Sequence, residues 1–95
     1  MLKHIVAWNL IETTSEADAN KISELLNKLI GQVEGLVHLK VHINLLSTST
    51  RSVVLDSTFT SEQALDAYQI HPLHQDAVVF IKSITTDRVC LDYFE

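Results

Sequence analysis

The 95-residue sequence is poor in the residues that break, cross-link or loosen a chain: it has two glycines, one proline and one cysteine. So few glycines and prolines exclude a long linker or a disordered low-complexity segment. The single Cys90 has no partner for an internal disulfide, which is typical of a reducing compartment and predicts a cytoplasmic protein. No signal-peptide pattern is present at the start, and no apolar run is long enough to span a membrane.

Basic residues are also scarce. Seven lysines and arginines stand against twelve acids, which gives a formal net charge of −5, and the basic residues are scattered along the chain. Such a chain lacks the positive patch that binds nucleic acid or an anionic membrane, so neither is expected as a partner. Hydrophobic residues make up 46% of the chain, which is enough for the core of one domain spanning residues 1–95.

Alternating apolar side chains predict four strands. They cover residues 2–11, 37–45, 52–59 and 86–94. The second of these alternates most regularly, and its inward row is expected to run from Val37 to Leu45. The first is apolar on both faces, with Val6 on one and Ile5 on the other, so both of its faces should be covered.

Helices are predicted between these strands. Residues 13–15 and the acids that follow them predict the start of the first helix, and its apolar stripe predicts an end at Gly31 or Gly35. Thr60 and Gln63 form a capping-box pattern, which predicts the start of the second helix.

The junction Tyr68-x-x-His71-Pro72-x-His74 contains the only proline of the chain. The residue before a proline is disfavoured in a helix, whereas proline is favoured at the first helical position. One helix should therefore end just before Pro72 and another should begin there and run to about residue 82. His74 then lies in the first turn, on the face that carries the aliphatic residues at helical spacing. These residues are Ala77, Val78 and Ile81.

Two interpretations of this junction stay open. In the first, the Tyr68 phenol and the His74 imidazole share a pocket, where a helix N-terminus keeps the imidazole neutral and available as a base. In the second, both are core residues whose polar atoms are satisfied locally. A metal site is not expected, because the proline separates His71 from His74 and two strand pleats place His38 and His42 roughly 13 Å apart. Zinc-type Cys/His spacing is absent.

The element order β-α-β-β-α-α-β predicts an α+β protein with a ferredoxin-like split β-α-β layout. Its helices should cover one face of the sheet and leave the other bare. Because Ile5, Ala7 and Ile11 make the bare face of the first strand apolar, a second copy of the chain is the simplest cover. A two-fold homodimer is therefore predicted.

Six segments of this sequence carry a resemblance to a known family. They are Lys3-His4-Ile5-Val6, Val33-Glu34-Gly35-Leu36, Val54-Leu55-Asp56-Ser57-Thr58-Phe59, Ala64-Leu65-Asp66-Ala67-Tyr68, His71-Pro72-Leu73-His74 and Asp92-Tyr93. Over nearly its whole length the chain resembles the stress-responsive dimeric α/β-barrel (Dabb) proteins. The resemblance implies ferredoxin-like protomers whose sheets pair into a dimeric α/β barrel, and plant members of the family are linked to stress tolerance.

The resemblance also implies a possible chemistry. One distantly similar member, the plant olivetolic acid cyclase, is a cofactor-free enzyme whose ring closure is attributed to a histidine and a tyrosine that look like His74 and Tyr68. It carries larger aromatic residues where this chain has Ile22 and Leu26, which argues against a long-tailed aromatic-polyketide substrate. The full set of ligand contacts expected here is His4, Val6, Trp8, Ile22, Leu26 and His71.

Three classes of function stay open. The first is a non-catalytic homodimeric barrel that serves stress protection or binds a small apolar ligand near Tyr68 and His74. The second is a cofactor-free lyase or polyketide-cyclase-like enzyme in which His74 is the base and Tyr68 the hydrogen-bond donor. The third is an oxygenase, cofactor-free or haem-dependent, for which the histidines are the only anchor. No cofactor is expected.

Overall fold

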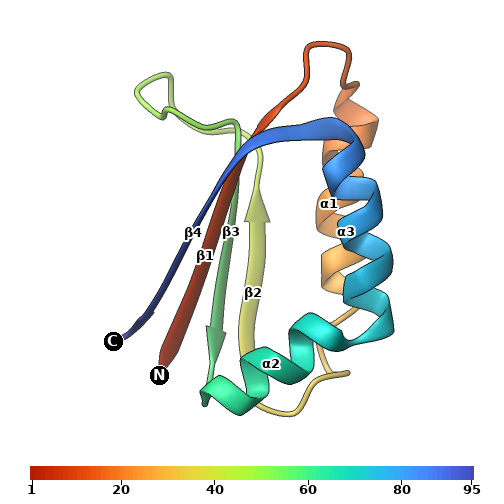
Figure 1. Ribbon diagram of the computed structural model, residues 1–95. Helices are drawn as coiled ribbons and strands as arrows, with labels where there is room; N and C mark the ends of the chain where they lie inside the picture. The colour runs from red at the N-terminus through yellow and green to blue at the C-terminus, as the bar shows by residue number, and fades with distance from the viewer.

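Four antiparallel strands and three helices make up the computed structural model, which describes residues 1–95 (Figure 1). The elements are β1 (Leu2–Leu10), α1 (Glu16–Asn27), β2 (Leu36–His42), β3 (Val53–Phe59), α2 (Glu62–Ile70), α3 (Pro72–Ile84) and β4 (Thr85–Phe94). The sheet order is β2-β3-β1-β4, which is the ferredoxin-like layout that the sequence predicted. None of the helices has the length and apolarity needed to cross a bilayer.

All three helices lie on one face of the sheet, and no element covers the other face (Figure 1). β1 buries His4 and Val6 on the helix side. The alternate residues of β1 point to the uncovered side, where Ile5 lies opposite Leu91 of β4 in the strand register. Leu91 is 63% exposed in the single chain. The uncovered face therefore carries an apolar strip, which we define as Ile5, Ala7, Val89 and Leu91.

The pairing of β1 with β4 brings the two ends of the chain side by side (Figure 1). Leu2 lies opposite Phe94 in this pairing. The backbone N–H of Glu95 donates to the carbonyl of Met1 at 2.9 Å. The last strand, β4, thus pairs with the first strand, β1, along its whole length.

α1 begins as predicted and ends earlier. The hydroxyl of Ser15 accepts a hydrogen bond from the N–H three residues later, which caps the helix. The helix stops at Asn27, and the expectation that it extends to Gly31 or Gly35 is wrong. Hydrogen bonds between residues three apart replace the helical ones there, so the chain continues in tighter turns. Tighter turns still bury apolar side chains of the predicted stripe, among them Leu29 and Val33.

β2 is shorter than predicted, and one of its residues faces the other way. It ends at His42, so the last three residues of the predicted strand lie outside it. The register with β3 shifts between Leu36 and His38, because the strand holds an extra residue there. Val37, expected to point inward, is 56% exposed as a result, whereas Leu39 is buried.

The helical junction forms at the predicted position. α2 is capped by Ser61, one residue after the predicted Thr60, because the Ser61 hydroxyl accepts from the N–H three residues later. The break at Pro72 is confirmed, since α2 ends two residues before it and α3 begins at it. His71 between them is extended, and its Nδ1 accepts a hydrogen bond from the N–H of Leu73 at 3.1 Å.

Gly35 holds a close approach between the turn before β2 and the start of α2. Its φ is +90°, and a Cβ added there would lie 2.6 Å from both the Cβ of Ala64 and the Oγ1 of Thr60. Its carbonyl accepts a hydrogen bond from the N–H of Thr60 at 2.8 Å. Only glycine fits this position without a shift of its neighbours.

Candidate functional site

Six of the eight residues expected to form a site line one cavity of about 390 Å³ between the sheet and the helices. They are His4, Val6, Trp8, Leu26, Tyr68 and His74. We call this space the Tyr68 cavity. The other two expected residues lie outside its lining: Ile22 is fully buried in the core, and the side chain of His71 caps α3.

The hydroxyl of Tyr68 is a buried polar group without a hydrogen-bond partner within the chain. The tyrosine has no exposed surface. Its ring centroid lies 5.1 Å from that of Phe59, 6.1 Å from that of His4 and 4.5 Å from that of His74. Burial raises the pKa of the phenol far above its ordinary value. The hydroxyl therefore stays protonated and remains a hydrogen-bond donor without an acceptor in the chain.

His74 approaches Tyr68 from the first turn of α3. Its Nδ1 donates to the carbonyl of Gln69 at 3.0 Å, so in the neutral ring Nε2 is the unprotonated nitrogen. Burial lowers the pKa of His74; the bond to Gln69 opposes this change, and the charges of His4 and Arg88 add to it. At neutral pH the ring is therefore uncharged, and its Nε2 can accept a proton.

His4 forms the floor of the cavity on β1 and has two partners on β4. Its Nδ1 lies 2.5 Å from the Oδ1 of Asp92, and the Sγ of Cys90 lies 3.8 Å from the same nitrogen. Sequence reasoning missed both partners, because 88 and 86 residues separate them from His4. The one signal for them was the alternation of the last strand, which put Cys90 and Asp92 on the same face. Burial, followed by the charge of Asp92, raises the pKa of the Cys90 thiol.

Two basic side chains that sequence reasoning missed complete the wall of the Tyr68 cavity. They are Lys82 of α3 and Arg88 of β4, and no carboxylate lines the same space. The cavity thus combines an apolar wall with a phenol, two imidazoles and two cations. Such a wall suits a small molecule with an apolar body and a polar or anionic end.

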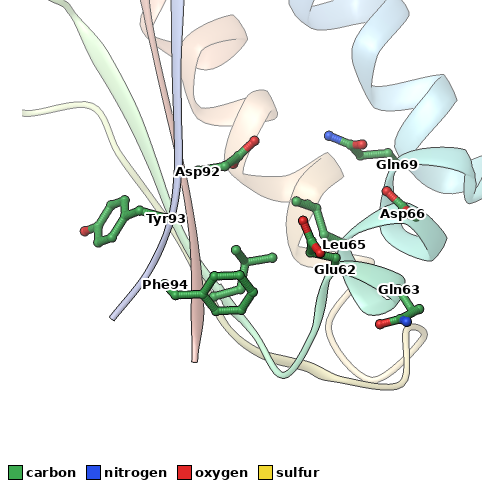
Figure 2. A pocket seen from close by; sticks show the side chains of 9 residues that line it. Glu62, Gln63, Leu65, Asp66, Gln69, Asp92, Tyr93 and Phe94 are labelled. Carbon is green, nitrogen blue, oxygen red and sulfur yellow. The ribbon is translucent and has the colours of Figure 1, made fainter.

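A larger cleft of about 520 Å³ lies between α2 and the end of β4 (Figure 2). We call it the α2–β4 cleft. Figure 2 shows the carboxylate of Asp92 reaching from the sheet towards α2, which carries Glu62 and Asp66, while Tyr93 points to the other side of the sheet. The cleft is acidic, whereas the Tyr68 cavity is basic. Asp92 belongs to the wall between them, because it lines the cleft and contacts His4.

Comparison with known proteins gives a family and a set of structural relatives. The model of the stress responsive A/B barrel domain (Dabb) family matches residues 2–95. A stress-response A/B barrel domain-containing protein from Arabidopsis thaliana is 30% identical over 99 residues, which cover 98% of this chain and 46% of that protein. The chain thus spans about half the length of this curated relative.

Two solved structures illustrate the shared fold. A dimeric ferredoxin-like protein of unknown function from Thermobifida fusca has a TM-score of 0.86 and 22% identity, covering 97% of this chain and 88% of that chain. Hydroxynitrile lyase from Passiflora edulis has a TM-score of 0.82 and 16% identity, covering 97% and 90%. At these identities the likeness establishes the fold and nothing finer.

Proposed function

Because this chain belongs to the stress responsive A/B barrel domain (Dabb) family, we propose that it is a homodimeric barrel that binds a small, largely apolar ligand in the Tyr68 cavity. The family name connects its members with stress responses, and a stress-related role for the bound form is part of this proposal. The cavity volume of about 390 Å³ falls within the range of roughly 300–1,000 Å³ typical of small-molecule sites.

The observation that carries the proposal is the unpartnered hydroxyl of Tyr68. A buried polar group without a partner costs about 1–3 kcal/mol, so folded proteins rarely keep one without a use. A carbonyl or carboxylate oxygen of a ligand would accept the hydrogen bond that the chain itself does not. Arg88 and Lys82 favour an anionic ligand over a cationic one, and Val6 and Ile81 supply apolar contacts for its body.

The homodimer is supported by the apolar strip on the uncovered sheet face. Val89 and Leu91 are 41% and 63% exposed in the single chain, and burying such a patch against its own copy removes an aggregation hazard. The structural relative from Thermobifida fusca is described as dimeric. In a sheet-to-sheet dimer the helices form the outside of the dimer. The Tyr68 cavity, between each sheet and its helices, then lies away from the interface.

A second candidate function is acid–base catalysis, which the contact between Tyr68 and His74 favours. The Nε2 of His74 would take a proton from a carbon next to a carbonyl. The C–H electron pair would form a C=C bond while the C=O π pair moves to the oxygen, and the O–H of Tyr68 would stabilise the resulting enolate. The enolate would then add to a second carbonyl carbon, and the proton would return from His74 to the new alkoxide. This is the chemistry of a cofactor-free cyclase, and its reverse is that of a lyase. The relative from Passiflora edulis is itself a lyase.

A thermal-shift screen with small carboxylates and ketones that carry an aliphatic or aromatic body tests the binding proposal. Ligands should raise the melting temperature of the wild type, and Tyr68→Phe should reduce this rise. Tyr93→Phe alters the exposed tyrosine and should respond like the wild type. Hits that stabilise Tyr68→Phe as strongly as the wild type would show that the hydroxyl is not the anchor. If no compound stabilises the wild type, the binding proposal fails.

A further inference from the structure

His4, Cys90 and Asp92 form a cluster that the proposed function does not use. Their side chains lie on the helix side of β1 and β4, and one ligand atom from each lies within 4.8 Å of the other two. We propose that this cluster is a binding site for a divalent transition-metal ion of the zinc type. The protein would supply three ligands, and a fourth position would be left for water or a small exogenous ligand.

The distances between the side-chain atoms support this assignment. Tetrahedral Zn²⁺ with bonds of about 2.0–2.3 Å places its ligand atoms about 3.3–3.8 Å apart. The Sγ of Cys90 lies 3.8 Å from the Nδ1 of His4 and 3.6 Å from the Oδ2 of Asp92. Cys90 is therefore already at zinc-site distances from the other two residues.

The other carboxylate oxygen of Asp92, Oδ1, lies 2.5 Å from the Nδ1 of His4, which is the distance of a hydrogen bond. An ion would have to replace this bond, and the carboxylate would have to withdraw by about 1 Å to reach tetrahedral spacing. Asp92 has room to do so, because its side chain is 42% exposed and lines the α2–β4 cleft. His4, at 2% exposure, is the fixed ligand. A short movement of one side chain is enough to assemble the site.

The set of donor atoms decides which metals fit. One imidazole, one thiol and one carboxylate suit Zn²⁺ and other late first-row ions, whereas Mg²⁺ and Ca²⁺ require oxygen ligands. The nearby charges are mixed: Glu62 and Asp66 across the cleft attract a cation, and Arg88 beside Cys90 repels one. Only an ion that forms strong bonds with nitrogen and sulfur offsets this repulsion, which again favours Zn²⁺ over Mg²⁺.

Metal binding would also change which hydrogen-bonding group His4 offers to the Tyr68 cavity. In the neutral ring without the ion, the Nδ1–H of His4 donates to Asp92, which leaves Nε2 as the unprotonated nitrogen. An ion on Nδ1 shifts that proton to Nε2, and the thiol of Cys90 releases its proton to solvent as it becomes the thiolate ligand. The imidazole on the floor of the cavity would thereby change from hydrogen-bond acceptor to donor.

Cobalt(II) gives a direct test, because Cys90 is the only cysteine of the chain. A thiolate-to-cobalt charge-transfer band in the near ultraviolet can therefore arise only at this site. The tag-free 95-residue chain titrated with Co²⁺ should develop the band, and Zn²⁺ should displace it. Cys90→Ser should abolish the band. Asp92→Asn should weaken Co²⁺ binding by at least the roughly 10–100-fold that loss of an outer partner of a metal ligand costs.

Control variants separate this site from adventitious binding. His42 lies exposed on β2, away from the cluster, so His42→Asn should keep both the band and the affinity. Tyr68→Phe should also keep the band, because the metal site does not depend on the ligand proposed for the Tyr68 cavity. Co²⁺ binding without the band, or Zn²⁺ affinity that Cys90→Ser leaves unchanged in calorimetry, would overturn the proposal. Failure of the wild type to bind either ion at micromolar concentration would overturn it as well.

Discussion

Replacing Tyr68 by phenylalanine removes one oxygen atom from the interior, and we expect the protein to become more stable. In most proteins the same substitution at a buried tyrosine is destabilising, because it breaks the hydrogen bond of the hydroxyl. Here the hydroxyl has no partner within the chain. The ring contacts with Phe59, His4 and His74 do not involve the oxygen and are available to phenylalanine.

The expected magnitude follows from the cost of the unpartnered group. A buried donor without a partner costs about 1–3 kcal/mol, and the lower end is the safer figure because removal of the oxygen leaves a small void. A gain of about 1 kcal/mol in the free energy of unfolding raises the melting temperature of a domain of this size by roughly 4–8 °C. The sign of the change is the part of the prediction that the structure determines.

Calorimetry on the wild type and Tyr68→Phe measures this change. Equal protein concentration keeps the contribution of dimerisation to the melting temperature the same for both proteins. Tyr93→Phe is the control for loss of a phenol oxygen outside the cavity: Tyr93 is 47% exposed in the single chain, and its substitution should not raise the stability as Tyr68→Phe does. A lower melting temperature for Tyr68→Phe than for the wild type would refute the reasoning. The hydroxyl would then have a structural partner, and its role as a ligand anchor would lose its basis.

Four other perturbations test the remaining inferences. His74→Ala should abolish turnover of any substrate found and leave the melting temperature nearly unchanged. A loss of about 1–3 kcal/mol in stability, together with no ligand for the wild type, would instead make His74 a core residue. Because burial holds the pKa of His74 below its ordinary value near 6.5, with Arg88 and His4 adding to that depression, the unfolded chain takes up the proton first. Stability should therefore be full above pH 6.5 and fall below it, and denaturant titrations should find a weaker dependence in His74→Ala. Ala7→Asp puts a charge into the apolar strip and should convert a dimer into a monomer in light scattering; a well-behaved wild-type monomer at micromolar concentration would contradict the dimer. Gly35→Ala should lower the free energy of unfolding in denaturant titrations by more than about 1 kcal/mol, because a Cβ there meets two neighbours at 2.6 Å in a left-handed conformation. An unchanged denaturation midpoint would mean that the turn relaxes freely.

The features predicted well from the sequence are those that local chemistry decides. Pro72 cannot continue a helix that begins before it, so the break between α2 and α3 could be predicted from one residue. The alternation in β1 predicted that His4 and Val6 share the helix side of the sheet. Placing His74 on the aliphatic face of α3 followed from helical spacing, and the structure puts it on the Tyr68 cavity.

The features that were missed depend on pairing between distant segments. The bulge that turns Val37 outward arises from the register with β3, which no alternation within the strand reveals. Arg88 reaches the Tyr68 cavity only because β4 pairs with β1. The same pairing brings Cys90 and Asp92 to His4, so a sequence search for closely spaced ligands missed the cluster.

The adjacency of the two chain ends has a consequence for how the protein is made. Among the elements of this domain β1 is synthesised first, but its pairing with β4 places Leu2 opposite Phe94 of the last strand. Contacts of such high sequence separation form slowly, since nearly the whole chain must be closed into a loop before they stabilise anything. During translation β1 therefore stays unpaired with β4, apolar on both faces and with at least one open edge, until β4 has been synthesised. A nascent chain in that state is a natural client for chaperones that shield exposed strands.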